Sequence, residues 1–130
     1  MKKALKIILG FVIIITLGGI LAYNIMNANL NRLAKRTIND VDLTRISDGR
    51  YQGSYGSFPI RAEVTVTIAD HAYRSITIDK HVTGQGQAAE GLPEIILEKQ
   101  SLEVDSISGA TYSSKAILMA IVDALESDKE

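Results

Sequence analysis

The sequence predicts an α+β protein, in which an N-terminal transmembrane helix is followed by a small antiparallel sheet packed with helices. Three observations support this fold class. Residues 7–31 contain no charged side chain. Residues 50–80 alternate apolar and polar side chains with the period of two that is typical of strands. Residues 114–126 repeat apolar side chains at helical spacing. The chain beyond the apolar segment is long enough for one small core.

The apolar N-terminal segment is long enough to cross a membrane, since a spanning helix needs roughly 20 apolar residues. We place the span at residues 7–26 and a cytoplasmic tail at residues 1–6, because three lysines precede the span. Arg32, Lys35 and Arg36 lie just beyond its far end. A cleaved secretory signal is the alternative, but its apolar core is usually shorter and ends at a small-x-small site. Both interpretations export the rest of the chain.

The composition excludes several kinds of redox and binding protein. The chain has no cysteine, which excludes disulfides, a lipoprotein anchor, thiolate metal sites, iron–sulfur clusters and covalent haem. Two histidines argue against a multi-histidine metal site. A net charge of −1 argues against nucleic acid as a partner. If the protein carries electrons, its carrier must therefore be of another kind.

Residues 27–47 form a juxtamembrane stalk between the membrane and the sheet. Apolar residues recur at three- and four-residue spacing from Leu30 through Ile38 to Val41, so the first helix can continue past the bilayer. A loosely ordered polar linker explains the same segment equally well. The run Ser-Asp-Gly at residues 47–49 ends it.

Two strands follow the stalk. Residues 50–55 alternate, with Tyr51 and Tyr55 most simply explained by packing within the sheet. The segment Gly-Ser-Phe-Pro at residues 56–59 is a turn. Apolar side chains then occupy every second position from Ala62 to Ile68, which is the clearest strand pattern in the chain.

A third strand completes an antiparallel meander. Asp70 and His71 are placed as a two-residue hairpin turn, because both residue types tolerate positive φ. The strand then covers residues 72–80 and is expected to place Arg74, Ile76 and Ile78 on one face. His81 follows as a residue at the strand end rather than a ligand.

Two helical segments complete the predicted domain. A glycine-rich turn at residues 83–86 breaks the sheet. Residues 88–96 fit a short helix or two helical turns, with a proline acceptable in the first turn. Residues 114–126 form an amphipathic helix that packs on the sheet, with Asp123 and Glu126 predicted to be solvated.

A hydroxyl-rich turn stands directly before the last helix. Residues 105–114 read Asp-Ser-Ile-Ser-Gly-Ala-Thr-Tyr-Ser-Ser. A helix N-terminus binds phosphate readily, because its unpaired N–H groups and the positive end of its dipole point the same way. Gly109 allows close approach of the backbone to a ligand, Ala110 keeps the space beside the next residue small, and Ser113 or Ser114 can cap the helix. The alternative is an ordinary loop leading into a helix, where these residue types are common.

This run also resembles the flavinylation motif of the FMN-binding domain family, which includes the C subunit of the sodium-translocating NADH:quinone reductase and the G subunit of the Rnf complex. The motif is Ser-Gly-Ala-Thr, here residues 108–111, with an Asp three residues earlier, here Asp105. Residues 48–53 resemble the opening Asp-Gly-x-Tyr-x-Gly strand of the family. Residues 94–111 resemble its helix and the stretch Gln-Ser…Val-Asp-x-x-Ser-Gly-Ala-Thr. We therefore place an FMN-binding domain at residues 48–130.

The resemblance implies how a cofactor is held. FMN would be joined through its phosphate to Thr111, and a separate FAD-dependent flavin transferase that requires Mg²⁺ would attach it. Asp105 would be the acid of the motif, and Ser108, Gly109 and Ala110 would form the turn around the phosphate.

Other residues complete the candidate cofactor site. Ser113 is included as a cap of the last helix. Gly84, Gln85 and Leu92 are candidates for contact with the isoalloxazine ring, although a plain turn and a core leucine explain them as well. Many relatives carry a Thr-Pro-Gly-type turn where this chain has Thr-Gly-Gln-Gly. We predict no catalytic residue and no metal site.

Together these features predict a single-pass protein of the cell membrane whose C-terminal domain is an extracytoplasmic flavoprotein. It is expected to relay electrons rather than to be a complete enzyme. No nicotinamide-binding fingerprint is present, so electrons would come from a partner such as a membrane redox protein or a quinone-linked oxidoreductase. Two alternatives stay open: a sensor or reductase that binds FMN reversibly, and an exported interaction domain without flavin.

Overall fold

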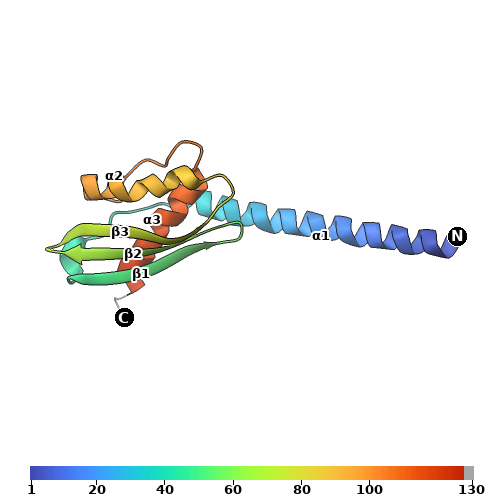
Figure 1. Ribbon diagram of the computed structural model, residues 1–130, viewed down its shortest axis with the longest axis horizontal. Helices are drawn as coiled ribbons and strands as arrows, with labels where there is room; N and C mark the ends of the chain where they lie inside the picture. The colour runs from blue at the N-terminus through green and yellow to red at the C-terminus, as the bar shows by residue number, and fades with distance from the viewer. Residues whose placement is uncertain (128–130) are drawn as a thin grey trace.

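The computed structural model describes residues 1–127, so the predicted domain end at residue 130 lies outside the described part of the chain. A long helix projects from a compact body made of three strands and further helices (Figure 1). In chain order the elements are α1 (Lys2–Ala34), the 3-10 helix η1 (Leu43–Arg45), β1 (Gly49–Ser57), β2 (Ile60–Ala69), β3 (Ala72–Val82), the 3-10 helix η2 (Gln87–Gly91), α2 (Leu92–Lys99) and α3 (Thr111–Glu126). The predicted α+β class is confirmed.

Helix α1 is long and apolar enough to cross a membrane, with a mean hydropathy of 2.5 and no buried residue in its most apolar stretch. Its 33 residues extend about 50 Å, so it includes most of the predicted tail and the first part of the stalk. The helix ends at Ala34. Ile38 and Val41 therefore lie beyond it and pack against the core, so the first helix continues into the stalk only as far as Ala34.

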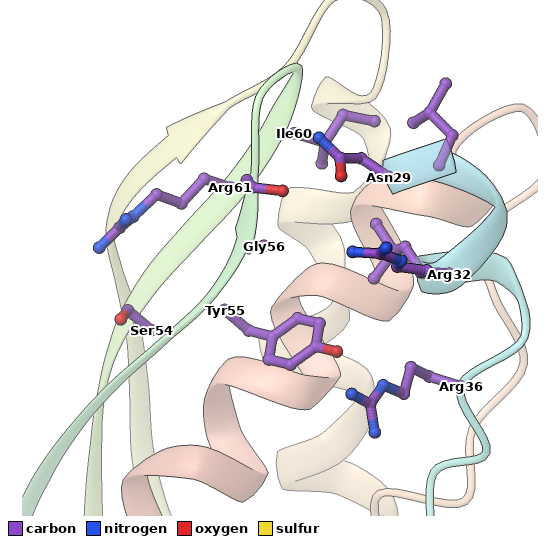
Figure 2. A pocket seen from close by; sticks show the side chains of 11 residues that line it. Asn29, Arg32, Arg36, Ser54, Tyr55, Gly56, Ile60 and Arg61 are labelled. Atoms are coloured by element: carbon purple, nitrogen blue, oxygen red, sulfur yellow. The ribbon is translucent and has the colours of Figure 1, made fainter. Parts of the chain in front are cut away.

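The end of α1 rests against the domain. Leu33 is buried in the core, and the side-chain amide of Asn29 donates a 2.9 Å hydrogen bond to the carbonyl of Phe58 in the turn between β1 and β2. Just beyond the helix, the Arg36 guanidinium lies 5.8 Å from the centroid of the Tyr55 ring on β1 (Figure 2). Such a cation–π contact is attractive, so three side chains tie this end of the helix to the sheet.

The sheet is an antiparallel meander in the order β1-β2-β3. The predicted β2 pattern is confirmed, because its alternate residues Ala62, Val64, Val66 and Ile68 are all buried. The turn at Asp70 and His71 is also confirmed. Both residues have positive φ, 53° and 58°, as a two-residue type I′ hairpin requires.

The prediction that Arg74 shares a face with Ile76 is wrong, because a bulge interrupts β3. Thr67 pairs with Ser75 while the next residue, Ile68, pairs with Tyr73, so Arg74 is an extra residue on β3. A bulge of this kind reverses the alternation of side chains. Tyr73 is consequently buried on the core face with Ile76, and Arg74 is exposed.

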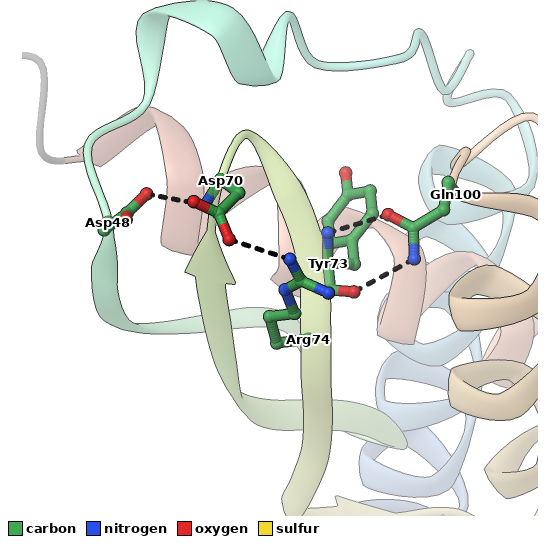
Figure 3. Close-up of polar contacts among 5 residues, drawn as sticks. All are labelled: Asp48, Asp70, Tyr73, Arg74 and Gln100. Atoms are coloured by element: carbon green, nitrogen blue, oxygen red, sulfur yellow. Dashed lines mark hydrogen bonds and ion pairs between the residues drawn. The ribbon is translucent and has the colours of Figure 1, made fainter.

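Strand β3 is an edge of the sheet, and one side chain covers part of it. The Gln100 amide accepts a 2.8 Å hydrogen bond from the Tyr73 N–H and donates a 2.9 Å bond to the Tyr73 carbonyl (Figure 3). Asp48 accepts from the N–H of Asp70 in the neighbouring hairpin, and Asp70 pairs with Arg74. The Gln100 side chain thus replaces the hydrogen bonds of a missing neighbouring strand.

Helix α3 packs across the sheet and supplies the core with side chains such as Ile117, Ile121 and Leu125. Gly53 allows this approach, since a Cβ there would overlap the backbone of α3 at two alanines. Asp123, which we predicted to be solvated, is half-buried and accepts a 2.9 Å hydrogen bond from the Ser54 N–H of β1. The sequence pattern places Asp123 off the apolar stripe of the helix but does not reveal its hydrogen bond to β1.

Candidate functional site

The hydroxyl-rich turn leads into α3 three residues earlier than predicted. The helix begins at Thr111, with Ala110 as its N-cap. Ser113 and Ser114 are therefore inside the helix and do not cap it. Both side chains are buried and bonded elsewhere: Ser114 Oγ accepts from the Ile107 N–H at 3.0 Å. The apolar stripe of the helix begins only at Ile117, so it could not reveal this extra turn.

A tight turn aims the chain into the helix. The Ala110 N–H donates to the Ile107 carbonyl at 2.9 Å, which closes a four-residue turn around Ser108 and Gly109. Gly109 has φ of 77°, the value that the third residue of a type II turn requires and that glycine adopts without strain. This conformation explains why the motif has glycine there.

The start of α3 faces the glycine-rich turn at residues 83–86. The hydroxyl oxygens of Thr83 and Ser113 lie 2.9 Å apart, and Thr83 Oγ1 accepts a 2.9 Å hydrogen bond from the Gly86 N–H. A Cβ on Gly86 would overlap the Ser113 side chain. The turn can therefore lie directly on the helix only because residue 86 is glycine.

A cavity of about 320 Å³ lies between these two segments. The turn at residues 83–86 and the start of α3 form two of its walls, while α1 and the segment that begins β2 complete it. Its lining residues are Leu30, Pro59, Ile60, Thr83, Gly84, Gln85, Gly86, Gly109, Ala110, Thr111, Tyr112 and Ser113. The cavity thus combines an apolar side with the polar start of a helix.

Six of the nine candidate cofactor residues line this cavity: Gly84, Gln85, Gly109, Ala110, Thr111 and Ser113. The other three do not. Asp105 and Ser108 are exposed on the loop before the helix, and Leu92 is fully buried in the core. The structure therefore brings the turn and the motif together across about 25 residues of chain and leaves Leu92 as a core residue.

Several lining residues were absent from the sequence candidates. Thr83 and Gly86 belong to the glycine-rich turn that the sequence indicates. The bond from Thr83 to Ser113 and the close approach of Gly86 to Ser113 join segments far apart in the chain, which no local pattern reveals. Tyr112 is an aromatic side chain that is 38% exposed, and its place within the motif could have marked it. Leu30 and Ile60 are apolar residues whose sequence pattern does not indicate a cofactor site.

The electrostatics of the cavity favour an anion at the start of α3. No side chain caps the N–H groups of the first turn, and no acidic residue lies in that turn. The positive end of the helix dipole is therefore not neutralised locally. Thr111 is exposed as the first helical residue, so its hydroxyl stands at the point where a phosphate group would be stabilised.

Within residues 1–127, no group of three or more histidine, aspartate and glutamate side chains is placed to hold a metal ion. His81 lies near the end of β3 with its side chain 2% exposed, and its Nδ1 lies 3.0 Å from Glu90 Oε1. It is thus a buried strand residue with a carboxylate partner, in line with the interpretation given to it from the sequence.

Comparison with known proteins identifies the segment that holds the cavity. Residues 55–126 match the FMN-binding domain family. The chain is also 31% identical over 116 residues to an NADH:acrylate oxidoreductase of Vibrio harveyi. That alignment covers 82% of this chain but 11% of the relative, so the chain spans about a tenth of the length of the curated relative. The matched family segment contains the glycine-rich turn, the motif and α3.

Proposed function

Because the chain belongs to the FMN-binding domain family, we propose that it is a membrane-anchored electron carrier with FMN attached covalently to Thr111. Flavin binding and a redox role follow from the family itself. One observation carries the covalent proposal: Thr111 is an exposed residue that begins an uncapped helix at the edge of a cavity.

The proposed link is a phosphoester bond between Thr111 Oγ and the phosphorus of FMN. With FAD as donor, the Thr111 hydroxyl loses its proton, the new P–O bond forms and the bond between the two phosphates breaks, releasing AMP. A threonine hydroxyl is a poor nucleophile alone, so the proposal includes a flavin transferase with Mg²⁺ as partner. The N–H groups at the start of α3 then stabilise the charge of the attached phosphodiester.

The cavity offers open space and apolar contacts to a flavin ring. An added Cβ on Gly84 or Gly109 would meet no heavy atom within 4 Å, so both glycines leave open space beside Thr111. Leu30 and Ile60 offer apolar contact. A volume of about 320 Å³ is at the lower end of the range of about 300–1,000 Å³ for small-molecule pockets. Part of the ring would therefore stay exposed, where a redox partner could approach it.

Membrane attachment completes the proposal. Helix α1 is long and apolar enough to span a bilayer, and the lysines before it favour a cytoplasmic N-terminus, which would place the domain outside the cytoplasm. A covalent link would keep FMN on the protein where free FMN would diffuse away. Leu30 lines the cavity, so the flavin would be held close to the membrane and to partners within it.

The partners proposed are membrane redox proteins or a quinone-linked oxidoreductase. The curated relative is named for a reaction of NADH with acrylate, and this name supports a redox role for the segment that the two proteins share. The family match supports a flavin-dependent role, and the lack of a nicotinamide-binding fingerprint in the sequence favours electrons that come from another protein.

The test is to produce the full chain together with an active flavin transferase and to compare it with Thr111→Val. We expect the wild type to gain the mass of one FMN less one water and to fluoresce in a denaturing gel, and Thr111→Val to do neither. Thr77→Val is the matched control, because Thr77 is exposed on β3 and does not line the cavity. It should be labelled like the wild type.

Two other results would contradict covalent attachment at this residue. Flavin that purifies with the protein but leaves on denaturation would indicate reversible binding. An unmodified wild type, made beside a transferase that labels another target, would indicate an exported interaction domain without flavin.

A further inference from the structure

A second cavity, of about 400 Å³, lies where the end of α1 meets the hairpin of β1 and β2. It shares Leu30 and Ile60 with the first cavity but otherwise has its own lining. Arginines are its distinctive feature: Arg32 and Arg36 project from the end of α1 and the residues just after it toward β1 (Figure 2). None of the 11 described residues that line this cavity is acidic.

The two arginines differ from the third arginine of the cavity. Arg61 forms an ion pair with Glu63 at 3.3 Å, and its guanidinium points away from the other two (Figure 2). Within residues 1–127, neither Arg32 nor Arg36 forms an ion pair. Arg36 is oriented by the Tyr55 ring, and its carbonyl accepts a hydrogen bond from the Lys115 ammonium group at 2.6 Å. The cavity thus holds two cationic groups on a fixed backbone without a protein anion.

The position of this cavity along α1 matches the outer surface of a bilayer. With the span at residues 7–26, Asn29 lies about 5 Å and Arg32 about 9 Å beyond the hydrocarbon, at 1.5 Å per residue. The polar headgroup layer on each side is about 5 to 8 Å thick. Arg32 therefore lies at the outer edge of the headgroups, from where a long side chain reaches into them.

The hairpin beside the cavity carries an apolar side chain at the same level. Phe58 is 73% exposed at the tip of the β1–β2 turn, and Asn29 of α1 bonds to its carbonyl. The backbone of this turn is thus tied to the membrane-spanning helix, and an exposed apolar ring carried on it would gain by burial at the bilayer interface.

We propose that Arg32 and Arg36 form a site for the phosphate of a phospholipid headgroup, which fixes the domain against the membrane. Guanidinium groups suit this ligand, because their planar donors match phosphate geometry. The proposal rests on the membrane placement in the proposed function but not on the flavin, so it is tested with protein made without a flavin transferase.

The experiment measures lipid binding to the full chain in non-ionic detergent by native mass spectrometry. Phosphatidylglycerol is titrated against the wild type, Arg32→Gln/Arg36→Gln and the control Arg45→Gln/Arg50→Gln. The control removes the same charge from exposed positions near the other end of the sheet. We expect affinity to fall about fivefold for each arginine lost from the cavity and to stay unchanged in the control. Equal affinity in all three proteins would overturn the proposal.

Two further arms separate the possible causes. Arg32→Lys/Arg36→Lys keeps both charges and should weaken binding less than the glutamine pair, whereas loss of the fold would abolish binding in both. Inorganic phosphate in large molar excess should leave the lipid bound. Full displacement of the lipid by inorganic phosphate would overturn the proposal and would indicate a site for a soluble anion. Failure of the wild type to stay with membranes during alkaline carbonate extraction would overturn both this site and the proposed anchor, while flavin attachment is measured separately.

Discussion

The hydroxyl oxygens of Thr83 and Ser113 lie 2.9 Å apart, and their hydrogen bond joins the turn after β3 to the first turn of α3. Ser113 is 1% exposed, so this bond is shielded from water. Thr83 also accepts from the Gly86 N–H, which fixes the shape of the turn. The two segments that form the flavin cavity are thus held together by one threonine.

Thr83→Val is expected to destabilise the protein more than Ser113→Ala. Valine keeps the shape of the side chain but leaves the Gly86 N–H and the Ser113 hydroxyl without partners, at a cost of about 1–3 kcal/mol for an unsatisfied buried group. In Ser113→Ala, Thr83 still accepts from Gly86, so the loss should be about 0.5–1.5 kcal/mol. Thermal unfolding of the detergent-solubilised chain, followed by near-UV circular dichroism of its tyrosines, measures the difference in stability between the two variants. Equal losses would show that Thr83 has no special role.

Gly86→Ala is expected to lower both stability and flavin attachment. The added Cβ would overlap Ser113, and overpacking of this kind costs about 1–3 kcal/mol. Gly84→Ala in the same turn is the control, because nothing lies within 4 Å of its added Cβ. Its unfolding temperature should match that of the wild type. If both variants unfold alike, close packing of the turn on α3 is not what requires glycine at residue 86.

Gln100→Glu tests the side chain that covers the edge of β3. The Gln100 amide nitrogen donates to the carbonyls of Tyr73 and Leu97, and a carboxylate cannot donate to either. We expect a loss of about 0.5–1.5 kcal/mol at neutral pH, partly relieved in acid, where a protonated carboxyl can donate. Urea unfolding at pH 4 and pH 7 measures the stability of the variant. Gln87→Glu, at an exposed position, is the control and should show neither the loss at neutral pH nor its relief in acid.

Tyr73→Phe is expected to stabilise the protein at neutral pH by about 1 kcal/mol, the lower range of the cost of an unsatisfied buried group. The Tyr73 hydroxyl is buried and has no partner among the described residues. Tyr51→Phe is the contrasting control and should be destabilising, because the Tyr51 hydroxyl donates a 2.7 Å hydrogen bond to the Ser47 carbonyl.

Comparison of the wild type with Tyr73→Phe also tests how stability depends on pH. Burial, with a further contribution from the charge of Asp40, raises the pKa of Tyr73 well above its usual value of 10.0. At pH above 10 the unfolded chain releases this proton while the native chain retains it, so the wild type loses stability as pH rises. Tyr73→Phe lacks this loss, and the stability gap between the two proteins should widen from pH 9 to pH 11. A constant gap over that interval would contradict a buried, protonated Tyr73.

The sequence predicted the elements whose patterns are local. A period of two from Ala62 to Ile68 marked β2, because alternate side chains of a strand share a face. The apolar run before residue 26 marked a possible membrane span, and residues 108–111 marked a site for a phosphate. Four of the six candidate cofactor residues at the cavity lie there for the same reason, since the motif and its helix are contiguous in the chain.

Tertiary structure alone decided which distant segments meet. The bulge at Arg74 follows from pairing with β2, which strand periodicity does not encode. Ser113 and Ser114 lie inside α3 and are bonded to Thr83 and Ile107, so neither serine side chain caps the helix.

The cavity shows the same division between sequence and structure. Thr111 could be named from its own neighbours, because residues 108–111 resemble the flavinylation motif and are contiguous in the chain. Leu30, Ile60 and Gly86 join it only after the chain has folded, since their positions depend on packing between elements far apart in the sequence. The sequence by itself therefore determined the attachment residue that we propose, and packing of α1, the sheet and α3 determined the site around it.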